Sequence, residues 1–333
     1  MKSSILNSNK TFIVAEIGNN HEGSFKIASE MIEAASNSGV DAVKFQTINP
    51  ENFVTSTDVN RIKQLSKFRL SNEEFIKLAN QANDLGILFF STPFDIESAK
   101  FLNNIQPIFK ISSGDNNFVQ LINTVFNFNK PTIISTGISE IEVIDRIYKK
   151  WLDGNFKSEI AFLHCVSSYP VPIKEANLGA INFFNKRYEK AIIGYSDHTI
   201  GIEASCAAVA SGAKIIEKHF TLDKNFSDFR DHSLSADPKE MKELVEKIKL
   251  INKMFFLDEK NIQQCEEKSI ISMKRSIAAA QDLEANSKIA YEHLTWLRPA
   301  TGLPPGEEEV FLGKVLKKNI LKGEILSLDM FYD

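Results

Sequence analysis

The chain of 333 residues has no long apolar run and only three cysteines. No stretch approaches the roughly 18–20 apolar residues that span a bilayer, which excludes membrane insertion. Cys165, Cys206 and Cys265 are widely spaced and form no C-x-x-C pair, and the first residues lead into no apolar signal segment. We therefore expect a cytoplasmic protein with reduced thiols.

The chain also lacks a basic excess, with a formal net charge of −4 and an isoelectric point near 6.0. Binding along a nucleic acid or an anionic membrane needs many uncompensated lysines and arginines, so the composition argues against both as partners. A small anionic substrate stays compatible, because a few local lysines can bind it. The length exceeds that of a usual single domain and predicts either a barrel with a small appendage or two domains.

Short apolar runs alternate with segments of helical period. The runs contain few alternating polar residues, which is typical of parallel strands covered by helices on their outer face. Eight strand–helix units predict an α/β protein with a (β/α)8 TIM barrel. The predicted strands cover residues 12–17, 42–46, 87–92, 108–111, 132–135, 160–164, 192–196 and 215–219. Predicted helices include residues 24–38, 71–85 and 200–211.

The barrel is expected to cover residues 1–258 and to end with a charged helix over 238–258. The segment 48–70 is longer than a simple strand–helix loop, and we expect it to cover the barrel mouth as a lid. Residues 259–274 have the composition of a polar linker. Residues 275–333 have the composition of a small β-rich domain. The strand-like pieces of that domain cover residues 276–280, 294–297 and 325–328.

Two of the barrel strands run into histidine-containing triplets, Ser196-Asp197-His198 and Glu217-Lys218-His219. Neighbouring parallel strands open on the same edge of a sheet, so both imidazoles can converge on one metal ion with Glu217 close by. Imidazole suits zinc, manganese or iron, and carboxylate or water ligands shift the preference toward manganese. The alternative is that each histidine only caps its strand through hydrogen bonds.

Lysines inside two apolar strands indicate an anion site. Lys44 and Lys110 must meet an opposite charge when buried, and an anionic ligand can supply it. Ser113-Gly114 and Thr136-Gly137 follow neighbouring strands, and glycine lets backbone amides approach phosphate oxygens closely. The alternative for Glu16, at the end of the first strand, is a salt bridge to one of these lysines. For His21 and His164 we expect a core role or one that supports a metal ligand.

Several of these strand ends together resemble the sialic acid synthase family, whose members condense phosphoenolpyruvate with an N-acetylated hexosamine to give nonulosonic acids. The resemblance covers almost the whole chain. The segments that carry it are AEIGNNHEG at 15–23, VKFQ at 43–46, FSTPFD at 90–95, FKISSG at 109–114, SSYP at 167–170, GYSDHT at 194–199 and EKHFTLD at 217–223. The C-terminal piece around Arg298-Pro299 resembles the antifreeze-like β-clip (SAF) domain of such synthases, which in that family reaches across a homodimer to the partner's active site.

The resemblance implies a role for each matching residue. A divalent metal held by His198 and His219 would polarise the sugar aldehyde; manganese is expected first, with magnesium or cobalt as alternatives. Catalysis would rest on Glu16, Glu217, Lys44 and Lys110. Phosphoenolpyruvate would be bound by Lys44, Thr92, Lys110, Ser113, Ser135, Ser167 and Ser196. The sugar would be bound by Gln46, Asp115, Tyr169, Asp231 and Arg298, in a domain-swapped homodimer.

The sequence also departs from the family at places that matter for the sugar. Asp115 stands where many members have glutamate, Ser167 where some have asparagine, and the stretch before Asp231 lacks the common proline-glycine-rich version. The substrate therefore stays open between N-acetylmannosamine and a 2,4-diacetamido-trideoxyhexose of mannose or altrose type. Two rival functions are another metal-dependent or phosphoenolpyruvate-dependent TIM-barrel enzyme of aldol type, and a non-catalytic carbohydrate-binding protein.

Overall fold

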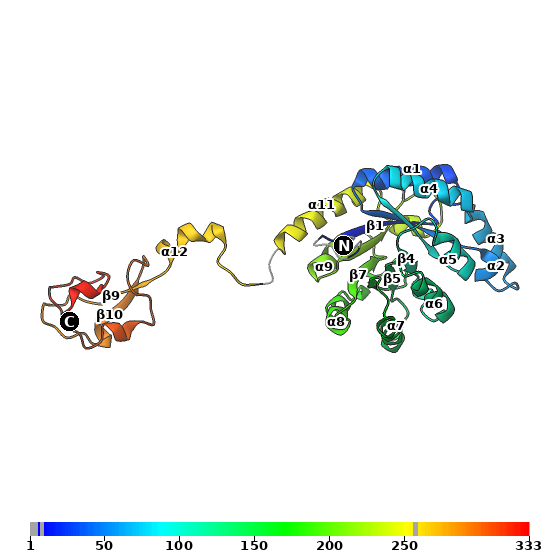
Figure 1. Cartoon of the computed structure of the whole chain (residues 1–333). Coiled ribbons are helices and arrows are strands. Elements are labelled where there is room, and N and C mark those ends of the chain that lie inside the picture. The colour runs from blue at the N-terminus through cyan, green and yellow to red at the C-terminus, as the bar shows by residue number, and fades with distance from the viewer. Residues whose placement is uncertain (1–5, 7–9, 256–258, 333) are drawn as a thin grey trace. The chain divides into compact units, whose positions relative to one another are not determined.

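The computed structural model describes residues 6, 10–255 and 259–332 and divides into two compact units, Met1–Phe256 and Leu257–Asp333. The first unit contains the barrel and the second a small domain with two short strands (Figure 1). Within the described ranges, no helix combines the length and apolar character needed to traverse a bilayer.

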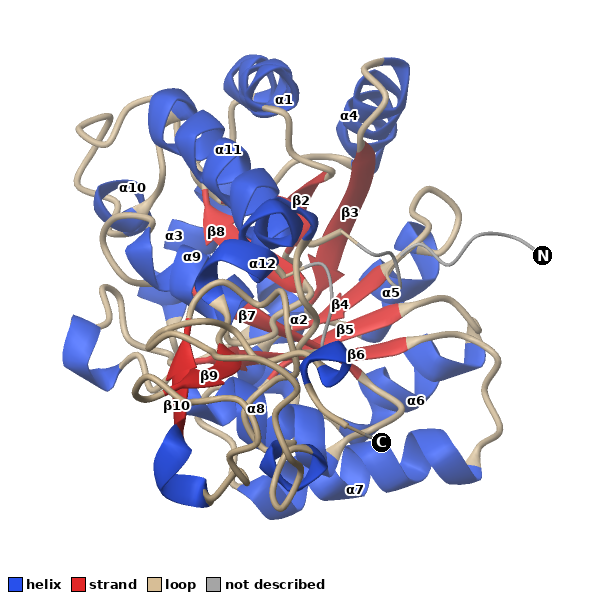
Figure 2. Cartoon of the chain, turned by 90° about the vertical axis from the view of Figure 1, so that its left-hand side faces the viewer, coloured by secondary structure: helices blue, strands red, loops and turns tan. Residues whose placement is uncertain are grey.

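The first unit is built on one parallel sheet of eight strands, which confirms the predicted barrel. The hydrogen-bonded order is β3-β2-β1-β8-β7-β6-β5-β4, and β3 and β4 at its two ends contact each other. Figure 2 shows these strands in red, with blue helices around them. The strands are β1 Phe12–Gly18, β2 Ala42–Thr47, β3 Leu88–Pro93, β4 Phe109–Ile111, β5 Thr132–Ser135, β6 Ile160–Cys165, β7 Ile192–Asp197 and β8 Ile215–His219.

Helices follow the strands and cover the outer face of the sheet. They are α1 Phe25–Ser38, α4 Asn72–Asp84, α5 Ile96–Leu102, α6 Val119–Asn127, α7 Ile141–Asp153, α8 Gly179–Arg187, α9 Glu203–Ala210 and α11 Pro238–Met254. Local sequence sets several starts, as where Ser71 and Glu74 form a capping box on α4. Helix α9 begins later than predicted, because the amide of Thr199 bonds to Asp197 and Gly201 adopts a positive φ of 83°.

Alternation along the strands divides the core into two parts. On β1 the side chains of Ile13, Ala15 and Ile17 pack outward in the large cluster beneath the helices. Phe12 and Val14 point inward and join an apolar cluster that fills the barrel near the amino ends of the strands. The next inward positions, toward the carboxyl ends, are where polar side chains begin.

The predicted lid segment 48–70 contains two helices, α2 Pro50–Phe53 and α3 Val59–Phe68. Asp58 caps α3 by accepting a hydrogen bond from the amide of Arg61. Another short helix, α10 Asp231–Leu234, follows β8. These elements lie at the carboxyl end of the strands.

The second unit has its own apolar core and an antiparallel pair, β9 Ser276–Ala279 and β10 Leu294–Leu297. The third predicted strand, over 325–328, was wrong: Ile325 forms a single bridge to Ala278, and a one-turn 3-10 helix follows at Leu328–Met330. The stretch predicted as linker includes a helix, α12 Glu267–Met273. The remaining 3-10 turns are Ser113–Asp115, Ile173–Glu175, Gln264–Glu266, Tyr291–His293 and Glu308–Val310.

Candidate active site

A cavity of about 990 Å³ opens at the carboxyl end of the barrel. Its deep part is lined by inward-facing positions two residues beyond the apolar layer, as Glu16 lies beyond Val14 and Glu217 beyond Ile215. The cavity brings together every predicted site residue of the first unit except Asp115. These are Glu16, Lys44, Gln46, Thr92, Lys110, Ser113, Ser135, Ser167, Tyr169, Ser196, His198, Glu217, His219 and Asp231.

Two carboxylates and two ammonium groups form the floor of this cavity, and we call Glu16, Lys44, Lys110 and Glu217 the charged floor. Lys44 Nζ lies 2.8 Å from Glu16 Oε2 and 3.7 Å from Glu217 Oε2. Lys110 Nζ lies 3.1 Å from Glu217 Oε1. All four side chains are at most 5% exposed. The salt-bridge alternative for Glu16 is therefore realised, although the same residue also lines the cavity.

The pKa values of the two carboxylates of the charged floor are shifted in opposite directions. Burial alone would raise the pKa of Glu217, but the charges of Lys110 and Lys44 outweigh it and lower that pKa to about 2. Burial raises the pKa of Glu16, and the charge of Lys44 offsets this only in part. Glu217 is thus held ionised, whereas Glu16 is the carboxyl that more readily takes a proton.

Hydroxyl groups surround the charged floor. Thr92 Oγ1 accepts a hydrogen bond from Lys44 at 3.2 Å, and Ser196 Oγ donates to Glu217 at 3.0 Å. Ser135 Oγ is buried, lines the cavity and has no hydrogen-bond partner among the described residues. The amide of Gly137 donates to Ser113 Oγ at 3.0 Å. Ammonium groups and hydroxyls together are the donors that a phosphate or carboxylate requires.

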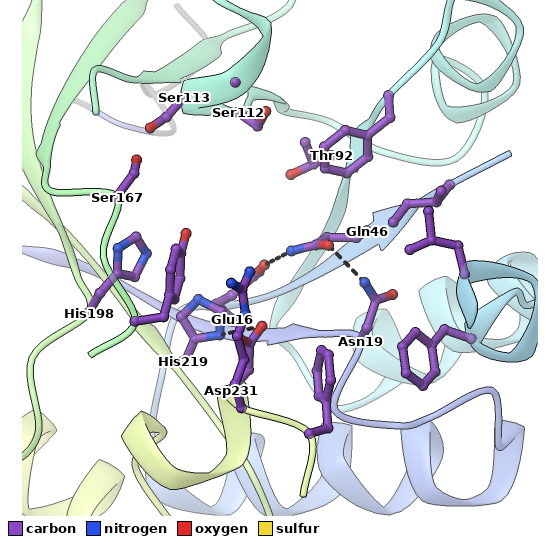
Figure 3. A pocket seen from close by; sticks show the side chains of 18 of the residues that line it. Glu16, Asn19, Gln46, Thr92, Ser112, Ser113, Ser167, His198, His219 and Asp231 are labelled. Atoms are coloured by element: carbon purple, nitrogen blue, oxygen red, sulfur yellow. Dashed lines mark hydrogen bonds and ion pairs between the residues drawn. The ribbon is translucent and has the colours of Figure 1, made fainter. Parts of the chain in front are cut away.

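The two histidines lie side by side, as Figure 3 shows, with ring centroids 5.3 Å apart. His198 Nδ1 lies 2.8 Å from the carbonyl oxygen of Val166. This contact engages Nδ1, so Nε2 is the ring nitrogen that remains for a ligand. His219 Nδ1 is buried and has no hydrogen-bond partner among the residues that the structure describes, and Asp231 Oδ2 lies 4.0 Å from it. Burial, together with the charges of His198 and Lys44, holds the pKa of His219 well below its usual value, so its imidazole is neutral.

Neutral imidazole is the form that binds metals, and His219 is held in that form. Burial alone would lower the pKa of His198, but its contact with Cys165 raises it, so His198 would release a proton when a divalent cation such as Mn²⁺ binds. In the part of the chain that the structure describes, no group of three or more His, Cys, Asp or Glu side chains is arranged to hold a metal. The donor set fits a site in which the two histidines supply nitrogen ligands and oxygen ligands complete the coordination.

Polar side chains next to the histidines form a second wall. Tyr169 packs against His198 with ring centroids 4.3 Å apart, and the guanidinium of Arg230 lies 4.6 Å from the Tyr169 ring centre. Gln46 accepts a hydrogen bond from Asn19 at 2.9 Å and donates to Glu16 at 3.0 Å (Figure 3). These contacts fix the direction of the Gln46 amide toward the charged floor.

Apolar side chains from the lid and the loops line the outer part of the cavity. We call this set the rim: Ile48, Phe53, Leu65, Phe68, Phe94 and Phe229. Phe68 of α3 packs against Phe229 with ring centroids 5.1 Å apart, and Phe53 of α2 packs edge-on against Phe94 at 4.9 Å. Gly23 lies so close to α3 that an added Cβ would overlap the carbonyl oxygen of Lys67. The predicted lid segment thus borders the cavity.

Comparison with known proteins agrees with this geometry. Residues 31–260 match the model of the NeuB family, and residues 274–331 match that of the SAF domain. The chain belongs to the NeuB family. It is 39% identical to an uncharacterized protein of Methanocaldococcus jannaschii, over 96% of this chain and 94% of that one. It is 36% identical to an N,N'-diacetyllegionaminic acid synthase of Campylobacter jejuni, over 95% of this chain and 99% of that protein.

A solved structure shows the same relationship. The N-acetylneuraminic acid synthetase of Leptospira borgpetersenii, in complex with citrate, is 34% identical, covers 81% of this chain and 94% of that one, and has a TM-score of 0.77. The predicted resemblance to the sialic acid synthase family and the predicted SAF domain are therefore confirmed.

Three residues of this NeuB family member do not line the cavity, which differs from the prediction for Asp115 and agrees with the core or supporting role expected for His21 and His164. Asp115 does not line the cavity, because the 3-10 turn after β4 directs its carboxylate to the hydroxyl of Ser112 at 2.5 Å. His21 and His164 also lie outside the lining. His21 accepts a bond from the amide of Gly23, and His164 contacts the carbonyl of Ala176.

Sequence reasoning missed several residues of the cavity wall, among them Asn19, Arg230 and Cys165. Asn19 follows β1 and bonds to Gln46, and Arg230 covers Tyr169. Cys165 lies 3.8 Å from His198 Nδ1 and 3.7 Å from the hydroxyl of Ser113. Burial alone would raise the pKa of the Cys165 thiol, but its contact with His198 lowers it. Alternation along β6 could have identified Cys165, because it lies two positions beyond the inward-facing Leu163.

Proposed function

We propose that this enzyme condenses phosphoenolpyruvate with an N-acetylated hexosamine to give a nonulosonic acid and phosphate. The observation that carries the proposal is the charged floor, which combines two buried lysines with two buried carboxylates inside a NeuB-family barrel. A reaction that binds two anionic groups and develops a positive charge at one carbon requires both signs of charge in one cavity.

The lysines bind the anionic groups of phosphoenolpyruvate. Without substrate, each ammonium of the floor is paired with a carboxylate, so two positive and two negative charges balance. Phosphate and carboxylate oxygens of the substrate then share Lys44 and Lys110 with these carboxylates. The hydroxyls that complete the anion site are Thr92, Ser113, Ser135, Ser167 and Ser196.

The two carboxylates divide the proton chemistry. In the proposed reaction, C3 of phosphoenolpyruvate attacks the aldehyde carbon of the open-chain sugar, and the resulting cationic C2 accepts water. Ionised Glu217, held by Lys110 and Lys44, stabilises that positive charge. Glu16, whose pKa burial raises, accepts a proton from the attacking water, and the alkoxide formed from the aldehyde oxygen takes up one proton, so the protons balance. Cleavage of the C–O bond then releases phosphate from the tetrahedral intermediate.

The sugar binds above the floor, between the histidines and the rim. His198 and His219 would hold a divalent metal, which would supply Lewis-acid polarisation of the aldehyde when bound. We assign hydrogen bonds to the sugar to Gln46, Tyr169 and Asp231, which line the cavity, and none to Asp115, which does not line it.

The rim favours a 2,4-diacetamido-trideoxyhexose over N-acetylmannosamine. Two acetamido methyls and a C6 methyl are apolar, and burying each methyl-sized group contributes about 0.8 kcal/mol. The side chains of Leu65 and Phe68 offer apolar surface, whereas a hydroxyl placed there would lose hydrogen bonds to water. The Campylobacter relative, a diacetyllegionaminic acid synthase by name, supports the same choice.

Arg298 of the second unit stays a prediction. It is exposed at the end of β10, and no ion pair or hydrogen bond of its side chain occurs among the described residues. The alternative in which it pairs with an acidic neighbour of its own domain is therefore not realised in the described part of that domain. A planar guanidinium suits an N-acetyl carbonyl, so we propose a role for it in sugar binding within a homodimer.

A substrate panel tests the function. The full chain is incubated with Mn²⁺, phosphoenolpyruvate and, in turn, N-acetylmannosamine, the diacetamido mannose-type sugar and its altrose-type isomer. Product mass and released phosphate are measured. A nine-carbon acid formed with equimolar phosphate supports the proposal. Phosphate release without a sugar-containing product, or no reaction with any of the three sugars, contradicts it.

A further inference from the structure

The middle residues of the two histidine triplets have no role in the site described above. Asp197 separates Ser196 from His198, and Lys218 separates Glu217 from His219. Their neighbours line the cavity, but Asp197 and Lys218 do not, because successive side chains of a strand point to opposite faces. Both are buried, with 0% and 1% of the side chain exposed.

The two residues pair with each other on the outer face of the barrel. Lys218 Nζ lies 3.2 Å from Asp197 Oδ2, and the two residues are direct partners in the β7–β8 register. Asp197 also accepts hydrogen bonds from the amide and hydroxyl of Thr199, each at 2.8 Å, and from Ser205 of α9 at 2.6 Å. Lys218 donates to the carbonyl of Thr199 as well.

This network joins four parts of the fold at one point. It connects the carboxyl ends of β7 and β8, the turn that follows His198, and the first half of α9. The cavity face shows the matching contact, since Ser196 and Glu217 are also register partners and are hydrogen-bonded at 3.0 Å. The contacts on the outer face and on the cavity face of β7 and β8 therefore depend on the same register.

Stability alone does not explain a charged pair at this position. Replacing a buried ion pair by apolar residues of similar volume is often neutral or stabilising. A slip of one residue, however, moves every side chain of a strand to the other face. Such a slip would separate Asp197 from Lys218 and leave both charges buried without an oppositely charged partner, whereas an apolar pair tolerates the slip.

We propose that Asp197 and Lys218 are positioning residues, which hold β7 and β8 in the register that makes His198 and His219 converge and places Ser196 against Glu217. This inference rests on the proposed function for its catalytic meaning. The coupling of this outer ion pair to ligand binding inside the barrel can be measured without turnover.

The test compares four variants of the full chain, of which the single variant Lys218→Met serves only if the double variant does not fold. In Asp197→Leu/Lys218→Met both charges are replaced together, so no buried charge is left unpaired. Asp41→Asn is the control: Asp41 accepts a bond from the amide of Ile13 at 2.7 Å at the amino ends of β1 and β2, away from the cavity. Lys218→Arg keeps the charge. Thermal midpoints, Mn²⁺ affinity by electron paramagnetic resonance and phosphate affinity by calorimetry are measured for each.

We expect the double variant to fold with a thermal midpoint within a few degrees of the parent, and to bind Mn²⁺ about 10- to 100-fold more weakly, as when the support of a metal ligand is lost. Phosphate binding should weaken as well, because Ser196 and Glu217 are displaced. Asp41→Asn should lower the midpoint and leave both affinities unchanged.

Parental affinities for both ligands in a folded double variant would overturn the inference. If the double variant does not fold, the single variants Lys218→Met and Lys218→Arg decide: weaker Mn²⁺ binding in Lys218→Met with affinity within about threefold of the parent in Lys218→Arg supports the inference, and equal affinities in the two variants contradict it. If the parent protein binds Mn²⁺ and phosphate but condenses no sugar, the proposed function is contradicted. The coupling between register and ligand binding is then still judged from the Mn²⁺ and phosphate affinities of the variants. If the parent binds no Mn²⁺, the phosphate affinities decide.

Discussion

The floor and the rim of the cavity are built on opposite principles. The floor consists of ionised side chains on strands, each buried and held by a partner, such as Lys110 by Glu217. The rim consists of apolar side chains on short helices and loops, and Phe53 there is 39% exposed. Charges need a rigid setting because a misplaced buried charge is costly, whereas apolar surface is tolerant of position. In the proposed function, the floor serves the steps that are the same for every sugar, and the rim serves the choice of sugar.

The strongest test of this contrast is Lys110→Ala on the floor. The change leaves Glu217 buried with one partner fewer, which should lower the free energy of unfolding by about 3–5 kcal/mol. It also removes a charge-assisted contact, so the KM for phosphoenolpyruvate should rise about 10- to 100-fold. Steady-state kinetics with each substrate varied in turn measure this. Lys186→Ala, on the exposed end of α8, is the matched control. A parental phosphoenolpyruvate KM with weakened sugar binding would reverse the assignment.

His219→Ala tests the histidine pair, which lies between the floor and the rim. Loss of one of the two imidazoles should weaken Mn²⁺ binding at least about tenfold, and activity should fall with it. His164→Gln replaces another buried histidine, one whose ring contacts the carbonyl of Ala176, and should leave Mn²⁺ affinity unchanged. Metal titration of the chelator-treated protein measures both variants. Full activity of His219→Ala after exhaustive chelation is incompatible with the proposed metal role.

Gly23→Ala displaces the rim without touching the floor. Gly23 and Gly86 have similar positive φ values of 80° and 77°, but only at Gly23 does an added Cβ meet another atom, the carbonyl oxygen of Lys67. Both variants carry the strain of a left-handed alanine, of about 1–2 kcal/mol. Only Gly23→Ala must also shift α3, at about 1–3 kcal/mol. The hexosamine KM should rise in Gly23→Ala alone; equal KM values in the two variants would mean that α3 does not shape the sugar site.

Phe68→Ala should have the smallest effect. Losing its ring contact with Phe229 costs about 0.5–1.5 kcal/mol, which corresponds to roughly a two- to tenfold rise in the hexosamine KM. The KM for phosphoenolpyruvate should not change. Phe183→Ala, at a partly exposed position on α8, serves as the control. If the KM for phosphoenolpyruvate changed as much as the KM for the sugar, the rim would not act on the sugar alone, and the proposed division between floor and rim would be contradicted.

The barrel could be predicted because parallel strands buried on both faces leave continuous apolar runs in the sequence. The convergence of His198 and His219 could be predicted for a related reason, since both follow neighbouring strands that end at one edge. Asp115 could not be placed in the same way. It also follows a strand, but in the 3-10 turn at Ser113–Asp115 its carboxylate accepts a hydrogen bond from Ser112, and Asp115 itself does not line the cavity. Turn geometry, which strand patterns do not encode, decided its position.

The residue sequence by itself determined which side chains share a face of each strand, because alternation has a fixed period of two. Glu16, Lys44, Lys110 and Glu217 were identifiable from it as separate inward groups. Only the tertiary structure decided that Lys44 meets Glu16 and Glu217 while Lys110 meets Glu217. These contacts join residues of β1, β2, β4 and β8, and β4 comes within reach of β8 only when the sheet curves into a barrel. Closure therefore converted four separate charges into one neutral floor.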